Sequence, residues 1–463
     1  MSMSRVVPTK ISQYKALPIG VSNKNLEISY TSIIPANSSS GTAFKPETTS
    51  RILFRVPAYQ NCFLDNARSC LSFTFTVDSD AADASGSGNI LNPKQGTQAL
   101  FKRMIIKSAN GLVIEDITDL DVLNKILDTF SSTTESRHME GIYDGSIHTD
   151  NNLTGGNKTE FNTRQKAGVK MLYFFKHGML SRDLQSYLPL HSMNGGNQGH
   201  AFSIELFMND NTSVLERLAT AGTAASIKSY SISDVRYNMT LLKADSSIID
   251  RFNNLSNDSS EIVIPFSTYR SYTNGLNAQK STVQISEACS DLRKVHTVIL
   301  SSTYETNPIA LSSTTEPSQL VFHGGNQSAD ANTKVKSYQL QVGSKFIYNE
   351  PIVSETDNME MLNQLLNASF SKSDIKATRY NGNVLQYENA DFNMTTTFCY
   401  DDPSRYTNGI SLGSLPLQLK LETAGVASGD KYLLTFSELG YNLVIKDGYL
   451  SVKDSKDISD FGY

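Results

Sequence analysis

The chain has no tryptophan and only four cysteines among its 463 residues. The cysteines, at positions 62, 70, 289 and 399, form no C-x-x-C pair and have no histidine at the spacing of zinc ligands. This pattern favours reduced structural thiols over a metal site. Cys62 and Cys70 could meet across a short turn, which leaves one disulfide as an alternative.

Long apolar runs and an excess of positive charge are also missing. No stretch of 18 apolar residues occurs, and residues 1–8 lack the apolar region of a secretory signal. We therefore expect neither a transmembrane segment nor secretion through a signal peptide. The 41 Lys and Arg residues against 46 Asp and Glu give a net charge of −5. This balance argues against strong direct binding of nucleic acid by the chain as a whole.

The common catalytic and cofactor motifs do not occur either. The sequence contains no H-E-x-x-H, no G-x-S-x-G, no phosphate-binding loop and no G-x-G-x-x-G, and its seven histidines are scattered. The acidic stretch 78–83 lacks the Gly and Glu of a calcium loop. Asp401 and Asp402 could supply half of a glycosidase pair, but nothing identifies a second carboxylate. The sequence thus predicts no catalytic residue, no metal site and no cofactor.

What the sequence does contain is alternation of apolar and polar residues, which is typical of strands half-buried against a core. Residues 71–77 alternate throughout, and residues 338–342 do the same. Residues 230–241 alternate on both sides of a one-residue slip near Ser233 and Asp234, which predicts a β-bulge. Charged residues are only 19 % of the chain, as expected for a β-protein with long polar loops.

Helical patterns are few. Thr118 can cap a helix that carries Leu120, Leu123 and Leu127 on one face. A second helix is predicted around Met359, and the short segments 212–219 and 245–255 also have helical patterns.

An internal repeat is the strongest sign of organisation. In each half, two strands flank a predicted two-residue hairpin turn, Asn110-Gly111 in the first and Gly343-Ser344 in the second. Other segments recur in the same order: 52–57 with 261–265, 200–207 with 415–421, and 230–242 with 432–446. The repeat predicts an all-β chain made of two copies of one β-sandwich in tandem, with a few short helices.

The predicted division is an N-terminal arm at 1–48, a first sandwich at 49–254 and a second at 255–463. The joint is placed at the polar, turn-rich residues 254–260. The start of the chain carries Arg5, Lys10 and Lys15 with no acidic residue before Glu27. Four basic residues in the first 24 without a pattern of aromatic residues favour docking on a protein neighbour over nucleic acid, so these three side chains are candidate assembly contacts.

Several segments together resemble the double jelly-roll major capsid proteins of viruses. They are residues 52–57, 70–77, 100–116, 187–190 and 230–237 in the first half, and 338–345 and 349–352 in the second. The similarity is greatest to polinton-like viruses and virophages, with adenovirus hexon and the capsid proteins of large DNA viruses as remoter relatives.

This resemblance implies two eight-stranded jelly rolls per subunit and a homotrimer with a pseudo-hexameric outline. Such trimers would tile an icosahedral shell around a DNA genome, with neighbouring trimers and penton and minor capsid proteins as partners, and the chain would be a virion component made inside the host cell. Two alternatives remain at this stage. One is a minor capsid, penton or attachment protein, and the other is a carbohydrate-active or carbohydrate-binding β-sandwich protein.

Overall fold

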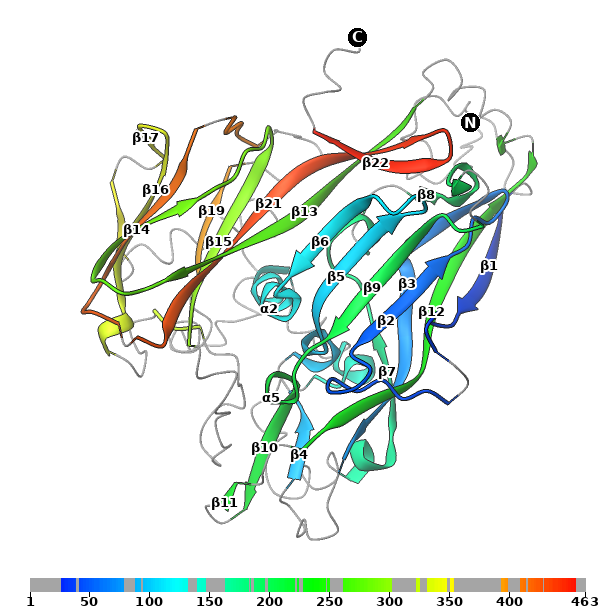
Figure 1. The fold of residues 1–463 in the computed structure, drawn as a ribbon, viewed down its shortest axis with the longest axis horizontal. Coiled ribbons are helices and arrows are strands. Elements are labelled where there is room, and N and C mark those ends of the chain that lie inside the picture. The colour runs from blue at the N-terminus through cyan, green and yellow to red at the C-terminus, as the bar shows by residue number, and fades with distance from the viewer. Residues whose placement is uncertain are drawn as a thin grey trace, which may run out of the picture.

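A computed structural model describes most of the chain. The described residues are 26–38, 41–78, 88–92, 95–131, 140–146, 163–182, 184, 187–195, 199–220, 223–224, 228–246, 248–249, 261–301, 322–324, 331–347, 350–353, 393–398, 409–413, 415–427 and 429–454. They form antiparallel sheets that pack face to face in two sandwiches, which lie side by side along the long axis of the molecule (Figure 1).

The first sandwich contains a five-stranded and a four-stranded sheet. The five-stranded sheet has the order β1-β12-β3-β7, with the short strand β8 (Leu188–Pro189) also paired with β3, and the four-stranded sheet has the order β2-β9-β5-β6. The strands of the first sheet are β1 (Leu26–Ile33), β12 (Tyr230–Ala244), β3 (Cys62–Val77) and β7 (Val169–Tyr173). Those of the second are β2 (Arg51–Val56), β9 (Phe202–Met208), β5 (Phe101–Ser108) and β6 (Val113–Thr118).

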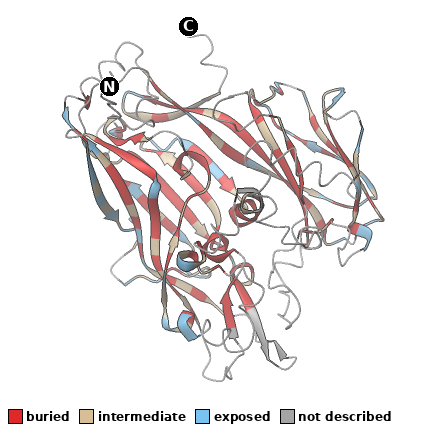
Figure 2. Ribbon diagram, turned by 180° about the vertical axis from the view of Figure 1, so that it is seen from behind, coloured by how far each residue is buried: buried red, intermediate tan, exposed pale blue. Residues whose placement is uncertain are grey.

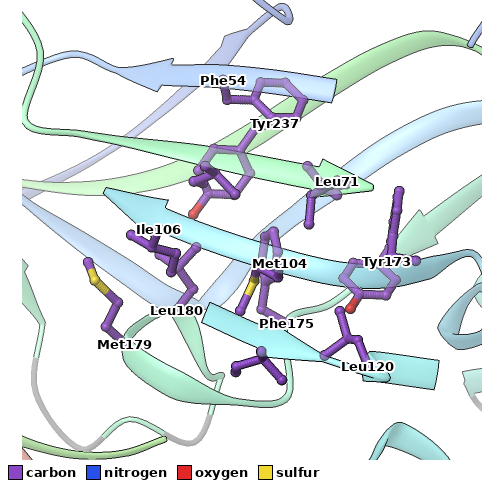
Figure 3. Packing of buried hydrophobic residues seen from close by; sticks show 14 of the residues in the cluster. Phe54, Leu71, Met104, Ile106, Leu120, Tyr173, Phe175, Met179, Leu180 and Tyr237 are labelled. Atoms are coloured by element: carbon purple, nitrogen blue, oxygen red, sulfur yellow. The ribbon is translucent and has the colours of Figure 1, made fainter. Parts of the chain in front are cut away.

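Aromatic and aliphatic side chains together fill the space between these two sheets (Figure 3). The Phe54 and Tyr237 rings, from opposite sheets, have centroids 6.1 Å apart, and Phe175 packs edge-on against both Tyr237 and Tyr173 at 5.9 and 5.4 Å. Offset and edge-to-face rings add to the stabilisation from apolar burial. The alternation in the sequence thus produces a buried core, seen as the red bands in Figure 2.

The second sandwich repeats this plan. Its sheets have the orders β13-β21-β15-β19 and β14-β20-β16-β17, and β18 also pairs with β16. The first sheet comprises β13 (Ile262–Gly275), β21 (Lys431–Lys446), β15 (Leu292–Ser301), β19 (Met394–Thr397) and β22 (Tyr449–Asp454), which pairs with β21. The second comprises β14 (Lys280–Ile285), β20 (Leu417–Thr423), β16 (Val335–Val342), β17 (Lys345–Phe346) and β18 (Ile352–Val353).

The order of strands confirms two eight-stranded jelly rolls and also corrects one predicted correspondence. Strand β9 corresponds to β20 and β12 to β21, as the repeat predicted. The pairing of 52–57 with 261–265 was wrong, because β2 occupies the place of β14 whereas β13 occupies the place of β1. Both segments are short apolar runs that end in proline, and only the sheet order distinguishes them. Strand β1 lies within the segment 1–48 and pairs with β12 along its whole length.

The predicted irregularity in β12 is present. The pairing of β12 with β3 shifts between Ser233 and Arg236, and Asp234 takes a positive φ of 50°. The turn at Gly343-Ser344 is the predicted two-residue hairpin, because Val342 pairs directly with Lys345.

The predicted two-residue turn at Asn110-Gly111 was wrong, because the loop has one residue more. Ser108 donates its N–H to the carbonyl of Leu112 (2.8 Å), and Gly111, at φ +87°, donates to the carbonyl of Ser108 (2.9 Å). This is a three-residue loop closed by a left-handed glycine rather than a type I′ turn, which would need a positive φ at Asn110 as well.

The helix after Thr118 is confirmed as α2 (Leu120–Ser131), with Leu120 and Leu123 buried. The predicted helix around Met359 lies outside the described residues. Segment 212–219 is mostly strand: the short helix α5 (Asn211–Val214) leads into β10 (Leu215–Thr220), which pairs with β4 (Gly88–Leu91) and β11 (Thr223–Ala224). These three strands form a small sheet at one end of the first sandwich (Figure 1).

The cysteines described are buried free thiols at 62, 70 and 289. The alternative of a Cys62–Cys70 disulfide was wrong. Both residues lie on the continuous strand β3, and eight residues at about 3.3 Å each separate them far beyond bonding distance.

Candidate assembly interface

The described part of the chain offers no centre for metal chemistry. No group of three or more His, Cys, Asp or Glu side chains among those residues could hold a metal ion. No helix among them is long and apolar enough to cross a membrane. The best-defined candidate site is instead the contact between the two sandwiches.

This inter-sandwich contact is built on apolar side chains. One hydrophobic cluster runs without a break from the core of the first sandwich onto the neighbouring sheet of the second, whereas the second sandwich's own core is a separate cluster. Besides Phe322, the side chains that the second sandwich contributes to the shared cluster come from four strands: Ile262, Ile264, Phe266, Tyr269, Val298, Leu300, Leu434, Phe436, Leu443, Ile445 and Leu450. An apolar contact of this kind resembles the interior of a single domain. We therefore expect the two sandwiches to keep a fixed position relative to each other.

Strand β13 makes the central polar contacts. The Thr118 and Ser271 hydroxyl oxygens are 2.5 Å apart, and the Ser271 hydroxyl donates to Asp119 at 3.3 Å. Thr118 and Asp119 stand at the end of β6 where α2 begins. The edge strand of one sandwich is therefore fixed against the β6–α2 corner of the other.

A second point of attachment lies at the turn between β21 and β22 (Tyr449–Asp454). The turn residues Asp447 and Gly448 have φ values of 52° and 82°, as a type I′ turn requires. The carbonyl of Gly448 accepts a hydrogen bond from the N–H of Gly195 in the first sandwich (2.9 Å). A Cβ on Gly448 would lie 1.9 Å from the Asn194 side-chain oxygen, so Asn194 would have to move, and the positive φ of Gly448 itself favours glycine.

Glu115 is a buried carboxyl group in the inter-sandwich contact. It lies on β6, and one of its oxygens accepts a hydrogen bond from the Met179 N–H at 2.8 Å in the short helix η4 (Gly178–Leu180). Burial raises the pKa of Glu115 to about 7, and hydrogen bonds from Met179 and Thr268 offset only part of this rise. A carboxyl group here is therefore largely neutral below neutral pH.

His177, next to η4, is buried in the same contact. Its ring packs edge-on against Tyr269 of β13, with centroids 5.7 Å apart, and contacts the Asn124 side-chain oxygen. Burial lowers the pKa of His177 to about 3, so the imidazole is neutral at physiological pH. Glu115 and His177 therefore act as packing and hydrogen-bonding groups that join β6, η4 and β13.

Helix α2 adds two further buried polar groups. The Asn209 side-chain amide donates to the Asp121 carboxyl at 2.9 Å, and burial raises the pKa of Asp121 to about 7. The Lys125 ammonium lies 4.4 Å from the centre of the Phe322 ring, a cation–π contact with a fully buried residue from the second half of the chain. The perturbed carboxyl groups are thus enclosed by protein rather than aimed at a cleft.

The predicted assembly residues Arg5, Lys10 and Lys15 lie outside the described residues, and so do Asp401 and Asp402. Sequence analysis did not find Glu115, Asp121 or His177. No motif marks them, because their environment is created by strands far apart in the chain.

Comparison with known proteins gives structural matches only. No protein-family model matches the sequence, and no curated protein matches it. The chain is similar to the crystal structure of PBCV-1 VP54 fitted into a reconstruction of the virophage Sputnik, with a TM-score of 0.58 and 9 % identity over 96 % of this chain and 100 % of that one.

Two further solved structures show the same fold. A Sputnik virophage structure determined by cryo-EM matches with a TM-score of 0.54 and 12 % identity, covering 100 % of this chain and 96 % of that one. The Faustovirus major capsid protein matches with a TM-score of 0.51 and 9 % identity, over 91 % of both chains. The described residues of the chain therefore have the double jelly-roll fold of these structures.

Proposed function

We propose that this chain is the major capsid protein of an icosahedral virus. It is a structural subunit and no enzyme, and it forms pseudo-hexameric homotrimers that tile a shell around a DNA genome. The observation that carries the proposal is the duplication: among the described residues, the two main sheets of each sandwich have the same order of strands. The solved structures that share this arrangement include the Faustovirus major capsid protein.

The duplication has a geometric purpose in such a shell. Three chains with two similar sandwiches present six similar lobes, so a threefold particle approximates a hexagon and packs in flat arrays. The continuous apolar cluster between the sandwiches supports this role because it fixes the angle between two lobes. Each trimer would then contact several neighbours, and individually weak contacts would sum to a durable shell.

The partners follow from this role. Within a trimer the partners are two other copies of the chain. In the shell they are neighbouring trimers, together with penton and minor capsid proteins at special positions. The chain would act as a component of the virion. We propose that the assembly arm comprises the residues before β1, with Arg5, Lys10 and Lys15 contacting a neighbouring subunit. Strand β1 itself belongs to the first sandwich, since it pairs with β12.

Neither alternative from the sequence gains support from the site. A carbohydrate-active protein would need paired carboxyl groups in an open cleft, but Glu115 and Asp121 are both buried. A penton usually has one jelly roll per subunit, whereas this chain has two.

Size-exclusion chromatography with light scattering tests the proposal directly. The purified chain should elute with about three times its 51.0 kDa mass, and negative-stain images should show a hexagonal outline. A mass of one chain under all salt and pH conditions would refute the capsomer.

A further inference from the structure

Three charged side chains are held together where helix α2 meets the chain that follows β7. Asp128 lies on α2, Lys176 comes just after β7, and Glu140 begins the helical residues 140–144. The Lys176 ammonium contacts Oδ1 of Asp128 and lies 3.7 Å from Oε2 of Glu140. The three side chains are only 8 %, 18 % and 10 % exposed for Lys176, Asp128 and Glu140. An amine and two carboxyl groups thus share a largely enclosed space.

The surroundings of this cluster are poor in water. Burial lowers the pKa of His177, the residue after Lys176, to about 3. Burial also raises the pKa of Asp144, four residues after Glu140, to about 6. Both changes disfavour the charged form of the group, which is the effect of lost hydration. A buried lysine in such surroundings can act as a nucleophile, because desolvation favours its neutral amine.

Glu140 is held in place beside the amine by two further contacts. The Arg182 guanidinium donates to Oε1 of Glu140 at 2.9 Å, and the other oxygen, Oε2, is the one nearer to Lys176. The Tyr143 ring packs edge to face against Phe174, with centroids 5.2 Å apart, and this contact fixes the helical segment of Glu140 against the chain before Lys176. A nucleophile next to a base that a third group orients is the arrangement of an activated nucleophile.

We propose that Lys176 and Asp128 become joined by an amide bond between their side chains, with Glu140 as the base. Because Oδ1 is bonded to Cγ, its contact with Nζ brings Nζ close to the distance of about 3–3.5 Å from Cγ at which held groups react. The Nζ lone pair forms the new bond to Cγ, and one Cγ–O bond breaks. Two protons leave Nζ, relayed by Glu140, and depart with that oxygen as water.

The reaction is balanced without any other reactant. One ammonium and one carboxylate give one neutral amide and one water, so no oxidant is needed, whereas a disulfide would require one. The bond closes residues 128–176 into a covalent loop and restricts the unfolded chain as a disulfide does. It forms within one chain, so the inference goes beyond the proposed capsomer and does not depend on it.

Mass spectrometry of the denatured wild-type chain is the first test. The intact mass should be lower than that of the sequence by one water, about 18 Da. After digestion with trypsin, peptide 126–137 should be joined to peptide 171–182, because trypsin does not cleave after a lysine whose amine is in an amide. An intact mass equal to that of the sequence, with the two peptides separate, would overturn the proposal.

Three variants test the role of each group. Lys176→Arg keeps the positive charge without the amine, and Glu140→Gln keeps the shape without the base, so both should have the full mass of their sequences. Asp128→Asn should still link, with loss of ammonia in place of water, and its linked peptide should have the same mass as that of the wild type. A loss of water that persists in Lys176→Arg arises elsewhere and overturns the bond. Complete linkage in Glu140→Gln overturns the role of the base.

The pair Lys107 and Glu205 is a matched control within the same digest. Its Nζ–O distance is 2.7 Å, but Lys107 is 31 % exposed. The third member of this group is Arg51, 3.0 Å from Glu205, rather than a second carboxyl group. Lys107 should therefore remain unlinked. Linkage of both pairs would show that contact alone is sufficient and would contradict the argument from burial and Glu140.

Discussion

Replacing Glu115 with glutamine should remove much of the pH dependence of the sandwich-to-sandwich contact. Burial raises the pKa of Glu115 from 4.5 to about 7, which corresponds to about 3 kcal/mol of free energy between its protonated and ionised forms. The folded state binds the proton more tightly than the unfolded state. The protonated Glu115 therefore stabilises the folded state fully below about pH 4.5, and this stabilisation is lost as the pH rises through about 7.

Glutamine has nearly the same shape and is always neutral, so it keeps an acceptor for the Met179 N–H at every pH. We expect Glu115→Gln to be more stable than the wild type at pH 8 by about 1–3 kcal/mol and close to it at pH 5. The measurement is urea unfolding at fixed protein concentration at pH 5, 6, 7 and 8. His177, whose pKa is lowered to about 3, weakens the fold on acidification, but this effect is common to both proteins and cancels in their difference.

The matched control is Asp116→Asn on the same strand. Asp116 is partly exposed and paired with Arg103, whose Nε donates to it at 2.7 Å, and an exposed pair of this kind contributes little. This variant should keep the wild-type pH dependence. If Glu115→Gln also keeps it, Glu115 does not titrate in the contact and the argument from burial is wrong.

Three other predictions concern the proposed assembly arm, the turn at Gly448 and the shared apolar cluster. Deleting residues 1–24 should leave trimers intact but prevent shell formation, as seen by electron microscopy; loss of the folded trimer would contradict an assembly role for the arm. Gly448→Ala should destabilise the fold by about 1–3 kcal/mol, because its Cβ would collide with Asn194 at a positive φ; Gly429→Ala, with no atom within 4 Å, is the control in thermal melts. Phe436→Ala should cost about 3–5 kcal/mol through the cavity it leaves in the shared cluster, and two separate melting transitions would show that the sandwiches have been uncoupled.

Alternation and turn residues were sufficient to predict the strands and the duplication. The slip at Ser233 and Asp234 identified a bulge because one extra residue changes which side chains face the core. The Gly343-Ser344 turn was predictable because glycine supplies the positive φ that such a turn requires. These features are local, and they are decided by residues next to one another in the chain.

The errors came from features that are decided by distant residues. Segments 52–57 and 261–265 look alike as isolated runs, and only their partners β9 and β21 show that they hold different places in the sheets. The sequence placed β1 in the predicted arm because its polar residues and the basic segment before it hide the alternation of a strand. Its place in the first sheet follows only from its pairing with β12. The pKa of Glu115 is set by burial and by hydrogen bonds from residues in η4 and β13. The sequence of β6 alone cannot show that these elements lie next to it.

The polar groups in the inter-sandwich contact have a further consequence for assembly. An apolar contact alone permits sliding, whereas Glu115, His177 and Ser271 each have one particular partner across the contact, namely Thr268, Tyr269 and Thr118. A ring of six lobes closes only if every angle between neighbouring lobes is nearly the same. Three of those angles are set within chains by this contact, so variants that loosen it should broaden the outline of the trimer before they unfold either sandwich. Images of Glu115→Gln and Phe436→Ala trimers should therefore differ: the neutral isostere should keep a sharp hexagonal outline, and the cavity variant should blur it.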